Sequence, residues 1–316
     1  MIKPLLMSLT MLMFASAAHA AEADAGLSHT LEIMRNTYRD LHRLSGVILI
    51  DVYVRNTSGT TRLAYLNDIE MIRFDNKFNI TNNDGSVTRR LAFDGDRFKR
   101  WNTTPANPAG SGRFNHATRT KPETETSMES WVHSAPYFGN WPFLFMAQDT
   151  MPIHRLLASN SKSVTVRSRS GGAEQLVIAC LKTGDYEFRI DCNRGCLVTE
   201  GKVLRKRSRG HMKAPKWADC LSQTFSFKVL MTQKLGDVWV PIEAEADEVA
   251  EYRNQPIRRV HYKLKLKEFK LLKSEPPAGT FDFEFPEGAS ICDSVTGAQY
   301  IAGQNGALLP ALKQKP

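Results

Sequence analysis

The sequence predicts a mainly β protein of the α+β class, built on an antiparallel sheet with one N-terminal helix. Apolar and polar residues alternate with a period of two in several segments, and turn signals rich in Gly, Asn and Asp separate those segments. One early segment instead has apolar residues at intervals of three and four, the spacing of an amphipathic helix. Strands with one apolar and one polar face are typical of antiparallel sheets, and the turns between them indicate a meander of hairpins.

The helix is expected from Leu27 to Leu44, with Ser28 as its N-cap and Gly46 ending it. Its opposite face is basic, so the apolar stripe must pack on another element. The stripe consists of Leu27, Leu31, Met34, Tyr38 and Leu41.

From Val47 onward the period changes to two, and the sequence predicts strands. The outward positions of these segments are mostly charged, as in His261, Lys263 and Lys265. The residues that share the apolar faces are Ile48, Ile50, Val52 and Val54; Tyr186, Phe188 and Ile190; Phe225, Phe227, Val229 and Met231; Val260, Tyr262, Leu264 and Leu266; and Phe281, Phe283 and Phe285.

An insertion interrupts the meander. Residues 103–130 are polar and rich in Pro and Gly at their start, which predicts a mobile loop. An aromatic segment with Trp141, Phe143 and Phe145 follows, and then a short helix is expected around Ile153 to Leu157. The aromatic segment either joins the core or forms a lid over an open sheet.

The first twenty residues have the pattern of a signal peptide. Lys3 is followed by an apolar stretch, and Ala18-His19-Ala20 is a small-x-small cleavage site before Ala21. The apolar run is shorter than the about 20 residues needed to span a bilayer. We therefore expect an exported, periplasmic or extracellular protein, with a single domain over residues 21–305 and a tail at 306–316.

Composition and net charge narrow the class of protein and the kinds of partner that can be expected. With 42% hydrophobic and 24% charged residues in 316, the chain is not a mostly disordered protein. The formal charge of +9 favours anionic partners, although export makes nucleic acid an unexpected one. Positive charge is concentrated in Arg205, Lys206, Arg207 and Arg209, which form either a solvated hairpin tip or a contact with an anionic membrane surface.

Motifs for catalysis and cofactor binding are missing from the sequence. It contains no G-x-S-x-G, H-E-x-x-H, Walker A or G-x-G-x-x-G motif, and its histidines are scattered singly. No cofactor, metal or catalytic residue is predicted. Among the five cysteines, Cys192 and Cys196 flank a turn and are a candidate disulfide; they are also the only positions to consider for a thiol-active enzyme.

Several short segments resemble the periplasmic lipoprotein-carrier superfamily (LolA/LolB-like, with the related envelope-stress sensor RseB). They are Gly46-Val47-Ile48-Leu49-Ile50-Asp51-Val52, Leu91-Ala92-Phe93-Asp94-Gly95-Asp96-Arg97-Phe98 and Ile190-Asp191-Cys192-Asn193-Arg194-Gly195-Cys196-Leu197. The tail from Phe283 to Tyr300 resembles the ending of secreted planctomycete-type outer-membrane lipoprotein-sorting proteins.

This resemblance implies a strongly curved half-barrel whose concave apolar face is covered by the N-terminal helix and the helical and aromatic insertion. Members of the superfamily shield acyl chains in such a cavity. For this chain the lid residues are expected to be Leu31, Met34, Tyr38, Trp141, Phe143 and Phe145. The cavity is expected to be lined by Ile48, Ile50, Val52, Tyr186, Phe188, Phe225, Phe227, Val229, Tyr262, Leu264, Phe281 and Phe283.

The function expected from these observations is that of a non-enzymatic, carrier-like protein of the cell envelope that binds a lipid or an acylated protein. The alternative is an envelope sensor or structural module whose sheet is filled by its own side chains and whose surface binds another protein.

Overall fold

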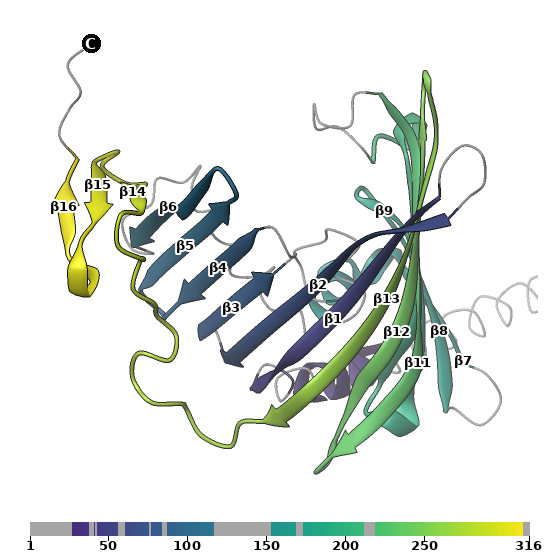
Figure 1. Cartoon of the computed structure of the whole chain (residues 1–316). Helices are drawn as coiled ribbons and strands as arrows, with labels where there is room; N and C mark the ends of the chain where they lie inside the picture. The colour runs from purple at the N-terminus through teal and green to yellow at the C-terminus, as the bar shows by residue number, and fades with distance from the viewer. Residues whose placement is uncertain are drawn as a thin grey trace, which may run out of the picture.

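The computed structural model describes residues 27–37, 41, 43–55, 61–75, 77–83, 87–116, 153–168, 173–211 and 219–311. Most of them form one large, curved and unclosed sheet (Figure 1), as the alternation predicts. Its strands are β1 (Leu44–Arg55), β2 (Thr61–Phe74), β3 (Lys77–Asn83), β4 (Thr88–Phe93), β5 (Arg97–Thr104), β6 (Asn107–His116), β7 (Val164–Ser168), β8 (Glu174–Leu181), β9 (Gly184–Asp191), β10 (Leu197–Lys206), β11 (Cys220–Leu235), β12 (Val238–Tyr252), β13 (Gln255–Leu271), β14 (Ser290–Asp293), β15 (Gln299–Ala302) and β16 (Leu308–Pro310).

The strand order is β16-β15-β14-β6-β5-β4-β3-β2-β1-β13-β12-β11-β10-β9-β8-β7. Consecutive strands pair as hairpins on both sides of β1, and β13 returns beside β1 to join the two halves. The pairing is antiparallel except between β14 and β6, which run parallel. In Figure 1, β3 to β6 with β14 to β16 form one arm, and the long strands β11 to β13 turn away from it.

One side of the sheet carries the main core. The apolar residues of β1 to β3 and of β8 to β13 that face this side alternate with more exposed ones and are buried in a single cluster. We call this side the inner face and the opposite side the outer face. The N-terminal helix (described at residues 27–37 and 41) and the short helix α4 (Ile153–Ala158) contribute to the same cluster through Met34, Ile153 and Leu157, so they cover the inner face.

The short helix lies where the sequence predicts it, but the first helix is shorter than expected. Leu44 is the first residue of β1 rather than the last of the helix. The periodicity could not separate the two assignments, because Leu44 faces the core in either conformation and is fully buried.

The prediction of a mobile loop from residue 103 is wrong for its first part. Thr104 ends β5, Asn107 begins β6, and a tight turn joins them. The Thr104 hydroxyl accepts a bond from the Asn107 N–H at 3.1 Å, and Gly110 has a φ of +82° with Trp101 beside it. The Pro and Gly residues therefore shape a hairpin. Residues 117–130 lie outside the described residues.

The C-terminal end also differs from the prediction. Residues 308–310 of the expected tail form the edge strand β16, where Leu309 pairs with Ile301. The segment at 272–289, expected to contain a strand, forms no strand and includes turns at 278–281 and 287–288. Figure 1 shows it leaving β13 and returning along the arm to β14.

Candidate functional site

The inner face of the sheet brings together nine of the twelve residues predicted to line an apolar cavity. Each is at most 6% exposed, and all belong to the main core cluster. Val229 is partly buried against the same cluster, near the end where β11 becomes exposed. The nine are Ile48, Ile50, Val52, Tyr186, Phe188, Phe225, Phe227, Tyr262 and Leu264.

Phe281 and Phe283 do not belong to this face. Asn79 lies between Phe78 and Ile80, which face the main core, so its side chain is on the outer face. Its amide donates to the carbonyls of Thr280 at 2.9 Å and Asp282 at 3.2 Å, which places the 280–283 segment there too. Phe283 packs in a second cluster with Phe285, Ile291 and Ala92. The alternation correctly indicated that Phe281, Phe283 and Phe285 are buried, but the predicted strand is wrong, and the alternation cannot tell which side of the sheet these residues cover.

The N-terminal helix is held on the sheet by apolar contacts and by two side-chain hydrogen bonds. Met34 is fully buried and Leu31 packs against the cluster. The Thr30 hydroxyl donates to Gln175 at 2.8 Å, and the Thr37 hydroxyl donates to the Gly195 carbonyl at 2.8 Å. The other predicted lid residues, Tyr38, Trp141, Phe143 and Phe145, lie outside the described residues.

A buried polar network lies at one end of the inner face. Glu248 is 7% exposed and accepts bonds from Gln223 at 2.9 Å and from the Tyr262 hydroxyl at 3.0 Å. Gln223 in turn accepts from Arg205 at 3.4 Å, and Arg205 also donates to the Thr183 carbonyl at 3.1 Å. A buried carboxylate needs such partners because its desolvation is costly. The apolar face therefore ends in a cluster of buried polar side chains that are hydrogen-bonded to one another.

This network corrects one prediction about the basic segment. Arg205 is only 9% exposed and points inward, so it is not part of a membrane-facing surface. The alternation along β10 places it on the side of Val203, which faces the core. Arg207 and Arg209 are exposed in the turn that follows, and Arg209 pairs with Asp185 at 2.5 Å.

Cys192 and Cys196 lie together at the turn between β9 and β10. Burial raises the pKa of both thiols, that of Cys196 to about 12, and the two side chains are hydrogen-bonded to each other. The backbone of Cys196 has a φ of +55°, an uncommon value for a residue with a side chain. Both are free thiols in this structure. Thiols with raised pKa values are poor nucleophiles at neutral pH.

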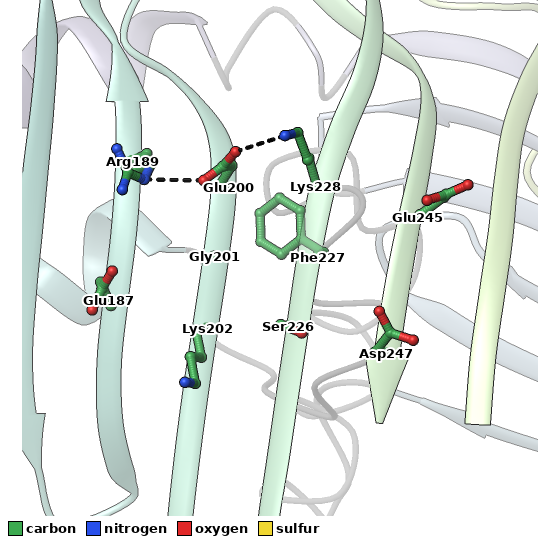
Figure 2. Close-up of a pocket in the computed structure, with 10 residues that line it drawn as sticks. All are labelled: Glu187, Arg189, Glu200, Gly201, Lys202, Ser226, Phe227, Lys228, Glu245 and Asp247. Carbon is green, nitrogen blue, oxygen red and sulfur yellow. Dashed lines mark ion pairs between the residues drawn. The ribbon is translucent and has the colours of Figure 1, made fainter. Parts of the chain in front are cut away.

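The outer face is hollowed across β9 to β12 (Figure 2), with a cavity volume of about 390 Å³. Glu200 accepts ion pairs from Arg189 at 3.0 Å and from Lys228 at 3.3 Å, so acidic and basic groups compensate each other. This hollow of mixed charge indicates no particular class of ligand. Its lining residues are Glu187, Arg189, Glu200, Gly201, Lys202, Ser226, Phe227, Lys228, Glu245 and Asp247.

Two searches were limited to the described part of the chain. Within it, no group of three or more His, Cys, Asp and Glu side chains is placed to hold a metal ion. None of the helices described is both long and apolar enough to cross a membrane.

Sequence reasoning missed the polar network. Glu248 interrupts the series Ala244, Ala246 and Ala250 on the inner side of β12, and Gln223 precedes Phe225 and Phe227 on β11 in the same way. A polar residue at an inward position of an otherwise apolar alternation was the signal that could have located it.

The sequence matches no known family model, and no curated protein matches it either. Among solved structures, the chain is similar to the crystal structure of a DUF1329 family protein from Desulfovibrio piger. The two share 6% sequence identity, and the match covers 80% of this chain and 96% of that chain with a TM-score of 0.43.

Proposed function

We propose that this protein is an exported, non-enzymatic, carrier-like protein of the cell envelope that holds an apolar chain between the inner face of its sheet and the covering helices. The observation that carries the proposal is the continuous apolar inner face, which spans β1 to β3 and β8 to β13 and which, among the described residues, is covered by helices. The signal-peptide pattern supports export, and the lack of enzyme motifs supports a binding role.

The way the lid is attached supports a reversible opening. The described attachments of the N-terminal helix to the sheet include hydrogen bonds from the Thr30 and Thr37 hydroxyls and apolar contacts. A neutral hydrogen bond contributes about 1 kcal/mol, whereas each buried CH₂ of an acyl chain contributes about 0.8 kcal/mol. An acyl chain of ordinary length can therefore offset the displacement of the helix.

The ligand is tested first by native mass spectrometry of the mature protein, purified from its own envelope without detergent and then offered phospholipid and an acylated peptide. A discrete, stoichiometric lipid mass is the expected result. Apo protein that stays unshifted by both offered ligands contradicts the proposal.

The lid is tested by the double variant Thr30→Val/Thr37→Val, which removes both hydroxyls and keeps the side-chain volume. We expect faster uptake and release of a fluorescent fatty acid, because the helix detaches more easily. Thr165→Val, at an exposed position on β7, is the matched control. Unchanged rates in the double variant exclude this helix as the lid.

A second candidate is an envelope sensor or structural module that binds another protein through its surface. It is favoured by the almost complete burial of the inner-face residues, several of which are 0–2% exposed. Apo protein in the mass measurement, together with capture of one defined envelope protein at constant stoichiometry, supports this candidate instead.

A further inference from the structure

Basic side chains from several strands come together at one end of the long strands. The pairing of Lys206 with Ser222 and of Arg259 with Arg55 places the end of β10, the start of β11, the β12–β13 turn and the end of β1 at this same end. In Figure 1 the β12–β13 turn lies at the top of the long strands. We call this the basic end. Its basic residues are Arg55, Lys182, Lys206, Arg207, Arg209, Arg253, Arg258 and Arg259.

The basic end is one surface, although its residues are distant in sequence. The Arg253 N–H donates to the Asp219 carbonyl at 2.9 Å, which ties the β12–β13 turn to the start of β11. Burial raises the pKa of the Cys220 thiol, and the positive charge of Arg207 acts against that rise, so the turn after β10 lies beside the same strand. From β9 to β1 this end covers five strand spacings, or about 24 Å.

The net charge of the basic end is positive whatever pairs its groups form. Arg209 pairs with Asp185, and Glu248 interacts with Arg258. Each such pair neutralises one charge of either sign. The eight basic residues face four acidic ones, the buried Glu248 included, which leaves a net charge of +4 among the described side chains. The acidic residues are Asp185, Asp219, Glu248 and Glu251.

Apolar side chains are exposed among these charges. Ile257, two residues from Arg259 and therefore on the same face of β13, is 47% exposed. Leu221, at the start of β11, is 41% exposed. Basic residues with exposed apolar side chains between them suit the boundary between lipid head groups and acyl chains, where both kinds of side chain are stabilised.

We propose that the basic end docks on the surface of an anionic lipid bilayer. Its positive charge attracts anionic head groups, and a charged surface about 24 Å wide fits a plane of head groups better than one small anion. Ile257 supplies an apolar contact that a purely electrostatic partner does not need. The docking uses the end of the strands and not the inner face, so it does not rest on the proposed function.

The test is flotation of the mature protein with vesicles of phosphatidylcholine alone and of phosphatidylcholine mixed with phosphatidylglycerol. Arg253→Gln/Arg259→Gln removes two exposed charges from the basic end. Lys267→Gln/Lys270→Gln is the matched control, because it removes two exposed charges from the opposite end of β13. Equal thermal midpoints establish that the variants are folded. The comparison of the two vesicle types with the wild type tests the proposal without any variant.

We expect the wild type to bind the mixed vesicles and not phosphatidylcholine, and the binding to weaken as salt is added. The arginine variant should bind about tenfold or more weakly, and the lysine variant should bind like the wild type. Equal losses in both variants would show that only the net charge matters, which overturns the docking at this end. Equal, salt-independent binding to both vesicle types also overturns it, while the proposed function stands.

A second comparison separates a bilayer from an anionic polymer. Heparin supplies negative charge without an apolar layer, so we expect the protein to bind heparin more weakly than mixed vesicles at equal concentrations of negative charge. Ile257→Ser should weaken binding to the vesicles several-fold and leave binding to heparin unchanged. Tighter binding to heparin than to vesicles, with no effect of Ile257→Ser on either, would overturn the inference in favour of an acidic macromolecule.

Discussion

His154 on α4 is a single residue from which a pH dependence of the free energy of unfolding can be predicted. Burial lowers its pKa from 6.5 to about 4, and the nearby Arg155 and Arg35 act in the same direction. Between these two values the unfolded chain binds a proton that the folded chain does not, so the free energy of unfolding falls as the pH falls from about 7 towards 4. Allowing for partial solvent screening, we expect a loss of about 1–2 kcal/mol.

Urea unfolding at pH 7 and pH 5 measures this loss. His154→Gln, which does not titrate, should lose less stability over the same interval. Equal losses in the two proteins would show that His154 is protonated without cost in the folded state.

The reactivity of Cys192 and Cys196 tests whether either thiol can act as a nucleophile. Because both pKa values are raised, we expect slow alkylation at pH 7, with Cys196 slower than the exposed Cys180. If the protein is exported to an oxidising compartment, the mature form should carry a Cys192–Cys196 disulfide, measured as a mass lower by about two hydrogens. Rapid alkylation of Cys196 at pH 7 would contradict the first expectation, and a reduced pair in the secreted protein would contradict the second.

Among the individual elements, β10 depends on a glycine. Gly201 pairs with Phe227 of β11, and a Cβ atom at residue 201 would lie 2.3 Å from the Phe227 ring. Gly201→Ala should therefore destabilise the protein by about 1–3 kcal/mol, measured by urea unfolding. Gly236→Asn is the control: its φ is +58°, Asn tolerates that conformation, and nothing lies within 4 Å.

The double variant Gly201→Ala/Phe227→Leu identifies the cause of the Gly201 effect. If the clash with the ring is responsible, the two substitutions should destabilise less together than the sum of their separate effects. Additive effects would attribute the loss to the backbone of β10 instead.

The elements also show what the sequence can and cannot predict. The alternation located β1, β9, β11 and β13 correctly, since each strand has one buried and one solvated face. The alternation could not show that residues 280–285 lie outside the strands of the sheet. A period of two also occurs in this segment, which is held by hydrogen bonds from the side chains of Asn79 and Lys99.

The candidate site was predicted in its apolar part only. Inward apolar residues are visible as a pattern along one strand, whereas the Glu248 network is assembled from side chains of the four neighbouring strands β10 to β13. The pairing of Ser111 of β6 with Ser290 of β14, in the one parallel pair of the described sheet, joins strands distant in sequence. No local pattern contains that pairing.

At the scale of the whole molecule, the arm differs from the rest of the sheet because it has a core on both sides. Its inner side joins the main cluster through Phe78 and Phe93, and its outer side is covered by the second cluster around Phe283. The strands β8 to β12 have no such cover among the described residues. We therefore expect the arm and the remaining strands to open separately.

Phe283→Ala tests this independence. We expect the outer cover of the arm to loosen, with a loss of about 3–5 kcal/mol in the stability of the arm, because the substitution leaves a cavity beneath Arg90 and Lys99. Native-state hydrogen exchange should then show faster exchange in β3 to β6 and unchanged exchange in β9 to β12. Leu309→Ala, at a residue 55% exposed on β16, should leave both regions unchanged. Equal acceleration in all strands would mean that the sheet unfolds as one cooperative unit.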